Sequence, residues 1–115
     1  AYTDPLKDKV AIVTGSATGL GASVALLLAE RGARVVINYT KSEKEAKETL
    51  AACKAKGVEA IMAQGDIGND DDCKKIAQAA IDQWGRIDIL INNAGLFAGI
   101  ERKAFWEIDL QNGNG

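Results

Sequence analysis

The most informative residues of this chain are the three glycines within residues 14–21 (TGSATGLG). This segment lies between an apolar, β-branched run at residues 9–14 and the start of an apolar helical pattern. At such a junction a phosphate meets free backbone amides and the positive end of a helix dipole. Gly15 allows the sharp turn, Gly19 lets the backbone approach a pyrophosphate closely, and Gly21 lets the helix pack tightly on the strand. The segment predicts a dinucleotide-binding loop, and a plain strand-to-helix turn is the alternative.

Two polar segments follow apolar runs that we expect to form buried strands. Residues 92–95 (NNAG) follow one such run, and Asp66 and Ile67 follow another. Ligands bind outside the carboxyl ends of the strands in open α/β sheets, so residues 92–95 are a candidate for the same site as the glycine loop. The alternatives are a strand-ending turn for residues 92–95 and a simple turn residue for Asp66.

Composition excludes several kinds of chemistry. The chain has no histidine, so no Ser-His-Asp or Cys-His mechanism operates within it. Cys53 and Cys73 lack the spacing of a metal or redox pair, and we predict reduced packing residues and no metal site. The formal net charge of -2, with dispersed basic residues, argues against nucleic acid and membrane partners. No apolar run is long enough to cross a bilayer and no signal peptide is evident, so the sequence predicts a cytoplasmic protein.

Short apolar runs alternate strictly with helical stripes along the chain. Buried strands are predicted at residues 9–14, 34–38, 59–64 and 87–91. Helices are predicted between residues 20 and 31, 42 and 57, and 69 and 85. This order is typical of parallel strands joined by right-handed crossovers. The predicted fold class is therefore α/β, a doubly wound parallel sheet of the Rossmann type.

Several residues mark the helix boundaries. Ser42 and Glu45 form a capping-box pattern, and Asn69 is a candidate N-cap. Gly32 and Gly85 stand where left-handed residues end helices. The third predicted helix has the clearest apolar stripe, whose members are Cys73, Ile76, Ala77, Ala80, Ile81 and Trp84.

The GxxxGxG spacing of residues 15–21 resembles the signature of the short-chain dehydrogenases/reductases. Residues 92–95 resemble the NNAG motif of the same family, and the two segments occur in the family's order. The resemblance covers roughly residues 6–110, and the chain looks like β-ketoacyl carrier-protein reductase-like and glucose dehydrogenase-like members. It implies an oxidoreductase that moves a hydride between a nicotinamide dinucleotide and an alcohol or carbonyl substrate.

The resemblance also implies which residues contact the cofactor. Asp66 would accept a hydrogen bond from the adenine amino group, and Ile67 would contact the ring. Residues 93–95 would form a backbone wall beside the ribose and nicotinamide, while Asn92 would hold neighbouring strands in place. The complete predicted set is Gly15, Ser16, Thr18, Gly19, Leu20, Gly21, Asn38, Tyr39, Thr40, Ser42, Asp66, Ile67, Asn93, Ala94 and Gly95.

The choice of dinucleotide depends on the end of the second predicted strand. No acid occurs between Arg34 and Ser42 to bind the ribose 2'-hydroxyl of NAD(H). Residues 38–42 (NYTKS) offer an amide, hydroxyls and a cation, and they resemble the Asn-Tyr segment of family reductases that use NADPH. We therefore favour NADP(H), with NAD(H) possible because Thr18 stands where many NADP-using relatives carry a basic residue. The sequence predicts that Asn38→Asp shifts the preference towards NAD(H).

The residues around this segment do not decide between NADP(H) and NAD(H). Ser42 has helix capping as an alternative role, and Lys41 has that of a solvated surface charge. Glu43 and Glu45 follow closely and would repel a 2'-phosphate. Use of both dinucleotides is therefore the alternative.

The chain lacks the residues with which the family carries out its chemistry. Complete family members are much longer and carry a Ser and a Tyr-x-x-x-Lys pair, in which a tyrosine of lowered pKa exchanges a proton with the substrate. Here Tyr39 is followed four positions later by Glu43 rather than Lys. We expect one incomplete domain at residues 1–115, the N-terminal half of the fold, with a core at about residues 6–95 and a loop at 96–115 leading to the next helix. This half would bind cofactor without catalysis, and no catalytic residue is predicted.

A nucleotide-binding module without catalysis, either sensory or structural, is the main alternative function. A flavodoxin-like mononucleotide domain is a second alternative, although its phosphate loop would not require the NNAG segment. For the full-length protein the resemblance implies a small alcohol or carbonyl substrate and a homo-oligomer.

Overall fold

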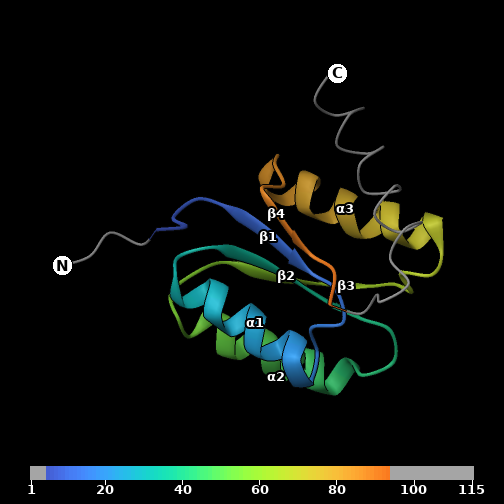
Figure 1. Ribbon diagram of the computed structural model, residues 1–115, viewed down its shortest axis with the longest axis horizontal. Helices are drawn as coiled ribbons and strands as arrows, with labels where there is room; N and C mark the ends of the chain where they lie inside the picture. The colour runs from blue at the N-terminus through green and yellow to red at the C-terminus, as the bar shows by residue number, and fades with distance from the viewer. Residues whose placement is uncertain (1–4, 94–115) are drawn as a thin grey trace.

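A sheet of parallel strands forms the centre of the computed structural model, which describes residues 5–93 (Figure 1). The strands are β1 (Val10–Val13), β2 (Arg34–Tyr39), β3 (Ala60–Gln64) and β4 (Ile89–Ile91). The helices are α1 (Gly19–Glu30), α2 (Glu43–Lys54) and α3 (Asp70–Trp84). The strands stand in the order β3-β2-β1-β4, and each neighbouring pair is parallel. This arrangement confirms the predicted doubly wound α/β fold.

Helices cover both faces of the sheet, with α1 and α2 on one face and α3 on the other (Figure 1). Successive side chains of β1 point to opposite faces of the sheet, so this strand contributes to the core on each face. Val10 and Ile12 pack in the core under α3, whereas Ala11 and Val13 pack in the core under α1 and α2. All four side chains are completely buried. A strand buried on both faces needs an unbroken apolar run, which is why the sequence pattern located β1 and β2.

The helix ends match the sequence signals at α3 and differ at α2. The Asn69 side chain accepts a hydrogen bond from the Asp72 amide at 3.0 Å, so it caps α3 as predicted. Gly85 ends α3 in the left-handed conformation, with a φ of 76°. The capping box predicted at Ser42 is wrong, because its side chain makes no cap hydrogen bond. Its backbone, with φ -87° and ψ 57°, is not in the extended conformation typical of an N-cap.

Both cysteines are buried free thiols, as the sequence predicted. Burial raises the pKa of the Cys53 thiol, and the nearby Lys56 charge only partly lowers it again. The thiol is therefore neutral and packs as a small apolar group. In the region that the structure describes, no cluster of His, Cys, Asp and Glu side chains is suited to holding a metal ion. None of the helices within residues 5–93 combines the length and apolar character needed to cross a bilayer.

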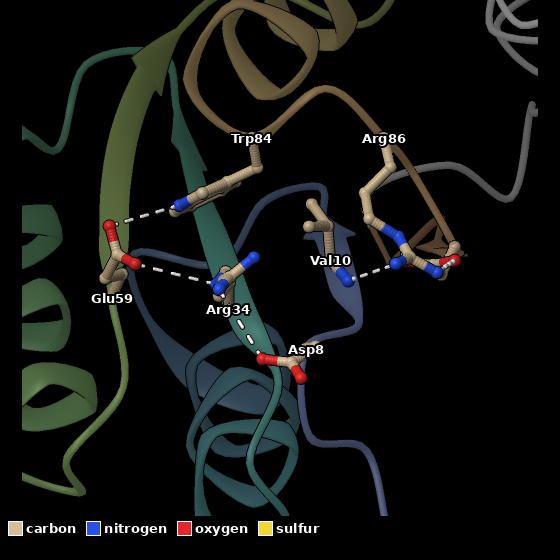
Figure 2. Close-up of polar contacts among 7 residues, drawn as sticks. Asp8, Val10, Arg34, Glu59, Trp84 and Arg86 are labelled. Atoms are coloured by element: carbon tan, nitrogen blue, oxygen red, sulfur yellow. Dashed lines mark hydrogen bonds and ion pairs between the residues drawn. The ribbon is translucent and has the colours of Figure 1, made fainter.

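Polar side chains connect the elements at the amino edge of the sheet (Figure 2). Arg34, at the start of β2, lies 3.5 Å from Asp8 and 3.6 Å from Glu59. Trp84, the last residue of α3, donates from Nε1 to Glu59 at 3.3 Å. These partners are largely exposed, so each pair contributes little to stability. The cluster lies at the opposite end of the strands from the glycine loop, and we assign it to the fold rather than to the site.

Asp88 joins the start of β4 to β1 at this same edge. Its carboxylate accepts a hydrogen bond from the Val10 amide at 2.9 Å and two from the Arg86 guanidinium at 2.8 Å. Burial raises the pKa of Asp88, but the hydrogen bonds from Arg86 and Val10 and the charges of Arg86 and Lys9 outweigh it. The pKa therefore lies below its usual range, and the carboxylate is ionised when it holds β1.

Candidate functional site

The glycine loop and the residues after β4 meet at the carboxyl edge of the sheet. The chain passes from β1 to β2 and β3 on one side of β1 and then crosses to β4 on the other side. Val13 at the end of β1 stands beside Ile91 at the end of β4, so the segments that follow both strands leave the sheet together (Figure 1). This is a topological switch point, the position at which open α/β sheets bind ligands.

The three loop glycines occupy positions that other residues fit poorly. Gly15 and Gly19 both have a φ of 59°, in the left-handed region that favours glycine. Around Gly19 no described heavy atom lies within 4 Å of the place where a Cβ would stand, so the backbone there is open to an approaching ligand. A Cβ on Gly21 would instead overlap the Gly15 carbonyl oxygen and lie 2.7 Å from Asn93 Nδ2. Gly21 therefore allows α1 to pack directly against the loop, as the sequence predicted.

The first turn of α1 presents free backbone donors to solvent. The first amide of the turn to find an acceptor is that of Ala22, which donates to the Thr18 carbonyl at 3.3 Å. No residue within 5–93 accepts a hydrogen bond from the amides of Gly19, Leu20 and Gly21. Gly19 and Leu20 are exposed, Leu20 by 71%, whereas Gly21 is buried, so the amides open to a ligand are those of Gly19 and Leu20. Free amides at a helix N-terminus bind anions, and phosphate is the usual ligand.

The side chain of Asn38, near the end of β2, holds the glycine loop by a hydrogen bond to Gly15. Its Oδ1 accepts a hydrogen bond from the Gly15 amide at 2.9 Å. Its Nδ2 donates to the carbonyls of Ala63 at 3.1 Å and Gly65 at 3.2 Å. Asn38 is only 2% exposed, which argues against the direct ribose contact expected from the sequence.

Two further side chains hold the loop. Ser16 is completely buried, and its hydroxyl donates to the Val13 carbonyl at 2.6 Å while accepting from the Asn38 amide at 2.9 Å. Thr49, on α2, donates from Oγ1 to the Ala17 carbonyl at 2.8 Å. The hydroxyl of Ser16 thus stabilises the glycine loop and is not exposed to a ligand. The sequence analysis missed Thr49, since nothing in the pattern of α2 shows that this residue lies under a loop 32 residues earlier in the chain.

The residues after β4 bond to the glycine loop. Thr14 Oγ1 donates to Asn92 Oδ1 at 3.1 Å, which confirms that Asn92 holds the ends of β1 and β4 together. Asn93 Nδ2 donates to the Gly15 carbonyl at 3.3 Å. The Nδ2 of Asn92 is buried, and no residue within 5–93 accepts a hydrogen bond from it. Buried donors are almost always paired, so we expect the acceptor for this Nδ2 to lie outside residues 5–93.

The segment after β3 contributes a turn at the same edge. Asp66 is exposed, its Oδ1 accepts from the Gly68 amide at 2.9 Å, and its own amide donates to Asp72 at 2.9 Å. Ile67 is only 8% exposed and packs in the core under α3. Asp66 therefore acts as a turn residue, which was the alternative to a ligand contact. Its contact with an adenine stays a prediction.

The loop between β2 and α2 carries the exposed residues predicted to select the dinucleotide. Thr40, Lys41 and Ser42 are exposed, whereas Tyr39 is half-buried and packs with the core under α1 and α2. Within the described part of the chain, the hydroxyls of Thr40 and Ser42 form no hydrogen bond. They stand at the carboxyl end of β2, beside the glycine loop. The predictions for residues 94–95, and for the loop at 96–115, lie outside the described residues.

Residues 9–113 match the sequence family described as short chain dehydrogenase. This chain belongs to the short-chain dehydrogenase family. The resemblance drawn from residues 15–21 and 92–95 is thereby confirmed. Within the described residues, the glycine loop and the two asparagines after β4 belong to the segments on which that resemblance was based.

Relatives of this chain include oxidoreductases from several bacteria. An uncharacterized oxidoreductase of Methylorubrum extorquens is 43% identical over 98 residues, which are 84% of this chain and 40% of the relative. The 3-oxoacyl-(acyl-carrier-protein) reductase of Staphylococcus epidermidis is 40% identical over 89 residues, 77% of this chain and 36% of the relative. A protein of Burkholderia cenocepacia described as a dehydrogenase and solved with bound NADP is 39% identical, with a TM-score of 0.73 over 80% of this chain and 36% of that one. The chain thus spans 36–40% of the length of these three relatives.

Proposed function

We propose that this chain provides the dinucleotide-binding part of an oxidoreductase that transfers hydride between NADP(H) and an alcohol or carbonyl substrate. The observation that carries the proposal is the set of free amides in the first turn of α1, placed at the switch point of the sheet. Membership of the short-chain dehydrogenase family supports an oxidoreductase, and it distinguishes this site from other anion-binding helix ends.

The residues present suit a dinucleotide pyrophosphate. The amides of Gly19 and Leu20 would donate to it, with the helix dipole adding a favourable field. The open space at Gly19 allows the close approach that such contacts need. The Nδ2 of Asn92, which has no acceptor within residues 5–93, would supply one more donor at the switch point. Asp66 would contact the adenine, and the backbone at residues 93–95 would line the ribose.

The preference for NADP(H) is supported by the loop between β2 and α2. Thr40, Lys41 and Ser42 offer two hydroxyls and a cation in an exposed position. Because Ser42 does not cap α2, its hydroxyl stays available for a 2'-phosphate. Glu43 pairs with Lys47 at 3.6 Å, which weakens the repulsion that its charge would exert. The Burkholderia cenocepacia relative, solved with NADP, favours the same preference.

The intact protein is expected to bind NADPH about 10-fold more tightly than NADH, since the 2'-phosphate gains charge-assisted hydrogen bonds. Lys41→Gln should reduce this ratio by roughly 3-fold, because one exposed cation is removed. Fluorescence titration with both reduced cofactors measures the ratio. Lys75→Gln, an exposed lysine on α3 across the sheet, serves as the control and should leave it unchanged. Tighter binding of NADH by the wild-type protein would contradict the preference.

The residues within 5–93 would bind and orient a cofactor, and none of them is placed to move a proton. When bound, the nicotinamide gives or receives the hydride. The reaction also needs a group that exchanges a proton with the substrate oxygen, and the sequence contains no Tyr-x-x-x-Lys. Tyr39 packs against the core under α1 and α2. We therefore propose that catalysis depends on residues outside this chain.

The purified chain of 115 residues is expected to show no NADP(H)-dependent turnover of alcohols or carbonyl compounds. Loss of a general acid alone lowers rates by roughly 100- to 10,000-fold, and the substrate positioning is lost as well. Absorbance of NADPH at saturating cofactor measures the turnover. Measurable turnover by the chain alone would refute this assignment. An intact protein that binds NADPH yet converts no alcohol or carbonyl compound would instead favour the non-catalytic module.

A further inference from the structure

We infer that Asn38 is a positioning residue, which fixes the glycine loop and thereby sets the affinity for NADP(H) and NAD(H) alike. This inference rests on the proposed dinucleotide function. It replaces the expectation that Asn38 selects between the two cofactors by contacting the ribose. The selection belongs instead to the exposed residues that follow it, Thr40 to Ser42.

Both polar atoms of the Asn38 side chain are bonded to backbone partners. An asparagine amide offers one acceptor oxygen and two N–H donors. Here Oδ1 accepts from the Gly15 amide, and Nδ2 donates to the carbonyls of Ala63 and Gly65. The residue is 2% exposed, so a bound molecule cannot replace these partners without opening the sheet. All three partners are backbone groups at the carboxyl ends of β1 and β3.

The backbone of Asn38 adds two further bonds to the same loop. Its carbonyl accepts from the Ser16 amide at 2.9 Å, and its amide donates to the Ser16 hydroxyl at 2.9 Å. The first two loop residues, Gly15 and Ser16, are therefore both tied to one residue of β2. The backbone conformation at the start of the glycine loop therefore depends on these hydrogen bonds to Asn38.

The hydrogen bond between Asn38 and Gly15 also affects the position of the α1 amides that would bind phosphate. The Gly15 carbonyl oxygen fills the space that a Cβ on Gly21 would need, and it accepts a hydrogen bond from Asn93. The position of Gly15 thus sets how closely the first turn of α1 lies on the loop. The free amides of Gly19 and Leu20 belong to that turn. A displaced Gly15 would move these donors away from the position that a pyrophosphate needs.

Other side chains cannot reproduce these three bonds. An ionised aspartate keeps an acceptor for Gly15 but places negative oxygen against the carbonyls of Ala63 and Gly65. A protonated aspartate restores one donor, so it imitates asparagine in part. Burial and the two carbonyls favour the protonated form, and the pKa of an aspartate at position 38 would therefore be raised.

Asn38→Asp in the intact protein tests the inference. Calorimetric titration with NADP+ and with NAD+ at about pH 8 should show both affinities reduced by roughly 10- to 100-fold, with their ratio unchanged. At about pH 5.5 the deficit relative to wild type should shrink by roughly 3-fold or more, because the protonated carboxyl again donates a hydrogen bond. A purely structural defect would lower the melting temperature without this change in the affinity of the folded protein.

Two variants complete the design. Gln83→Glu makes the same amide-to-acid change at an exposed position near the end of α3, and it should alter neither affinity. Asn38→Ser is smaller and uncharged, and it should fold even if Asn38→Asp does not. Its hydroxyl has a single donor and a shorter reach, so it cannot make all three bonds, and both affinities should fall by roughly 10-fold.

The outcomes separate the inference from the function on which it rests. A wild-type protein that binds neither dinucleotide would overturn both. Wild-type binding together with unchanged affinities in both Asn38 variants would overturn the inference alone. A ratio shifted towards NAD+ in Asn38→Asp would also overturn it, since that result requires direct contact with the ribose.

Discussion

Gly19→Val is expected to abolish detectable binding of NADP(H) by the intact protein, a loss of at least about 100-fold. The Gly19 backbone has a φ of 59°, and the space beyond its Cα is open in the described structure. A valine side chain would fill the space through which a pyrophosphate reaches the amides of α1. A branched residue in the left-handed region also costs about 1–2 kcal/mol of stability. Fluorescence titration measures the affinity, and thermal unfolding measures the stability.

Gly57→Val is the matched control for this substitution. Gly57 also has a positive φ, 92°, and no described atom lies within 4 Å of its missing Cβ. It follows α2 at the amino side of β3, away from the glycine loop. The control should therefore lose comparable stability and keep its cofactor affinity. Equal affinity for NADP(H) in Gly19→Val and wild type would exclude the glycine loop as the phosphate site.

Gly21→Ala is expected to weaken NADP(H) binding by roughly 30-fold or more and to lower stability by about 1–3 kcal/mol. The added methyl group would overlap the Gly15 carbonyl oxygen, which is backbone and is itself held by Asn38 and Asn93. Either α1 or the loop must then move, and the amides of the first turn move with it. Calorimetric titration and thermal unfolding of the same preparation measure the two effects.

Gly85→Ala separates the two effects of the Gly21 substitution. Gly85 ends α3 with a φ of 76°, and no described atom lies near its missing Cβ. The control should lose about 1 kcal/mol of stability because alanine is strained in the left-handed region, and its affinity should stay unchanged. A Gly21→Ala protein with lowered stability and wild-type affinity would show that the packing of α1 on the loop does not control the phosphate donors.

The order of strands and helices was predictable because it depends on local pattern. The strands that are buried on both faces require unbroken apolar runs, and β1 and β2 are completely buried apart from the two ends of β2. The cap at Asn69 and the left-handed Gly85 depend on residues of α3 itself. Gly15 and Gly19 were recognised for a similar reason, since a positive φ restricts the residue type at its own position.

The cap at Ser42 could not be decided from the same kind of local pattern. Ser42 and Glu45 have the spacing of a capping box, but the chain enters α2 from the end of β2 with a backbone that does not direct the Ser42 side chain to the helix amides. The path of that loop is set by where β2 ends in the sheet. The availability of the Ser42 hydroxyl therefore follows from the tertiary structure.

The sequence by itself determined the α/β fold, the glycine loop and the family, because each depends on residue types at short spacing. Only the tertiary structure decided what Asn38 and Thr49 do, and which side chain Asn92 contacts. Asn38 meets Gly15 across 23 residues of sequence, and Thr14 meets Asn92 across 78. Such contacts depend on β1 lying between β2 and β4 in one register. The local sequence around Asn38 is compatible both with an asparagine that binds a ribose and with one that binds three backbone groups. The burial of Asn38 at the end of β2 distinguishes the two roles.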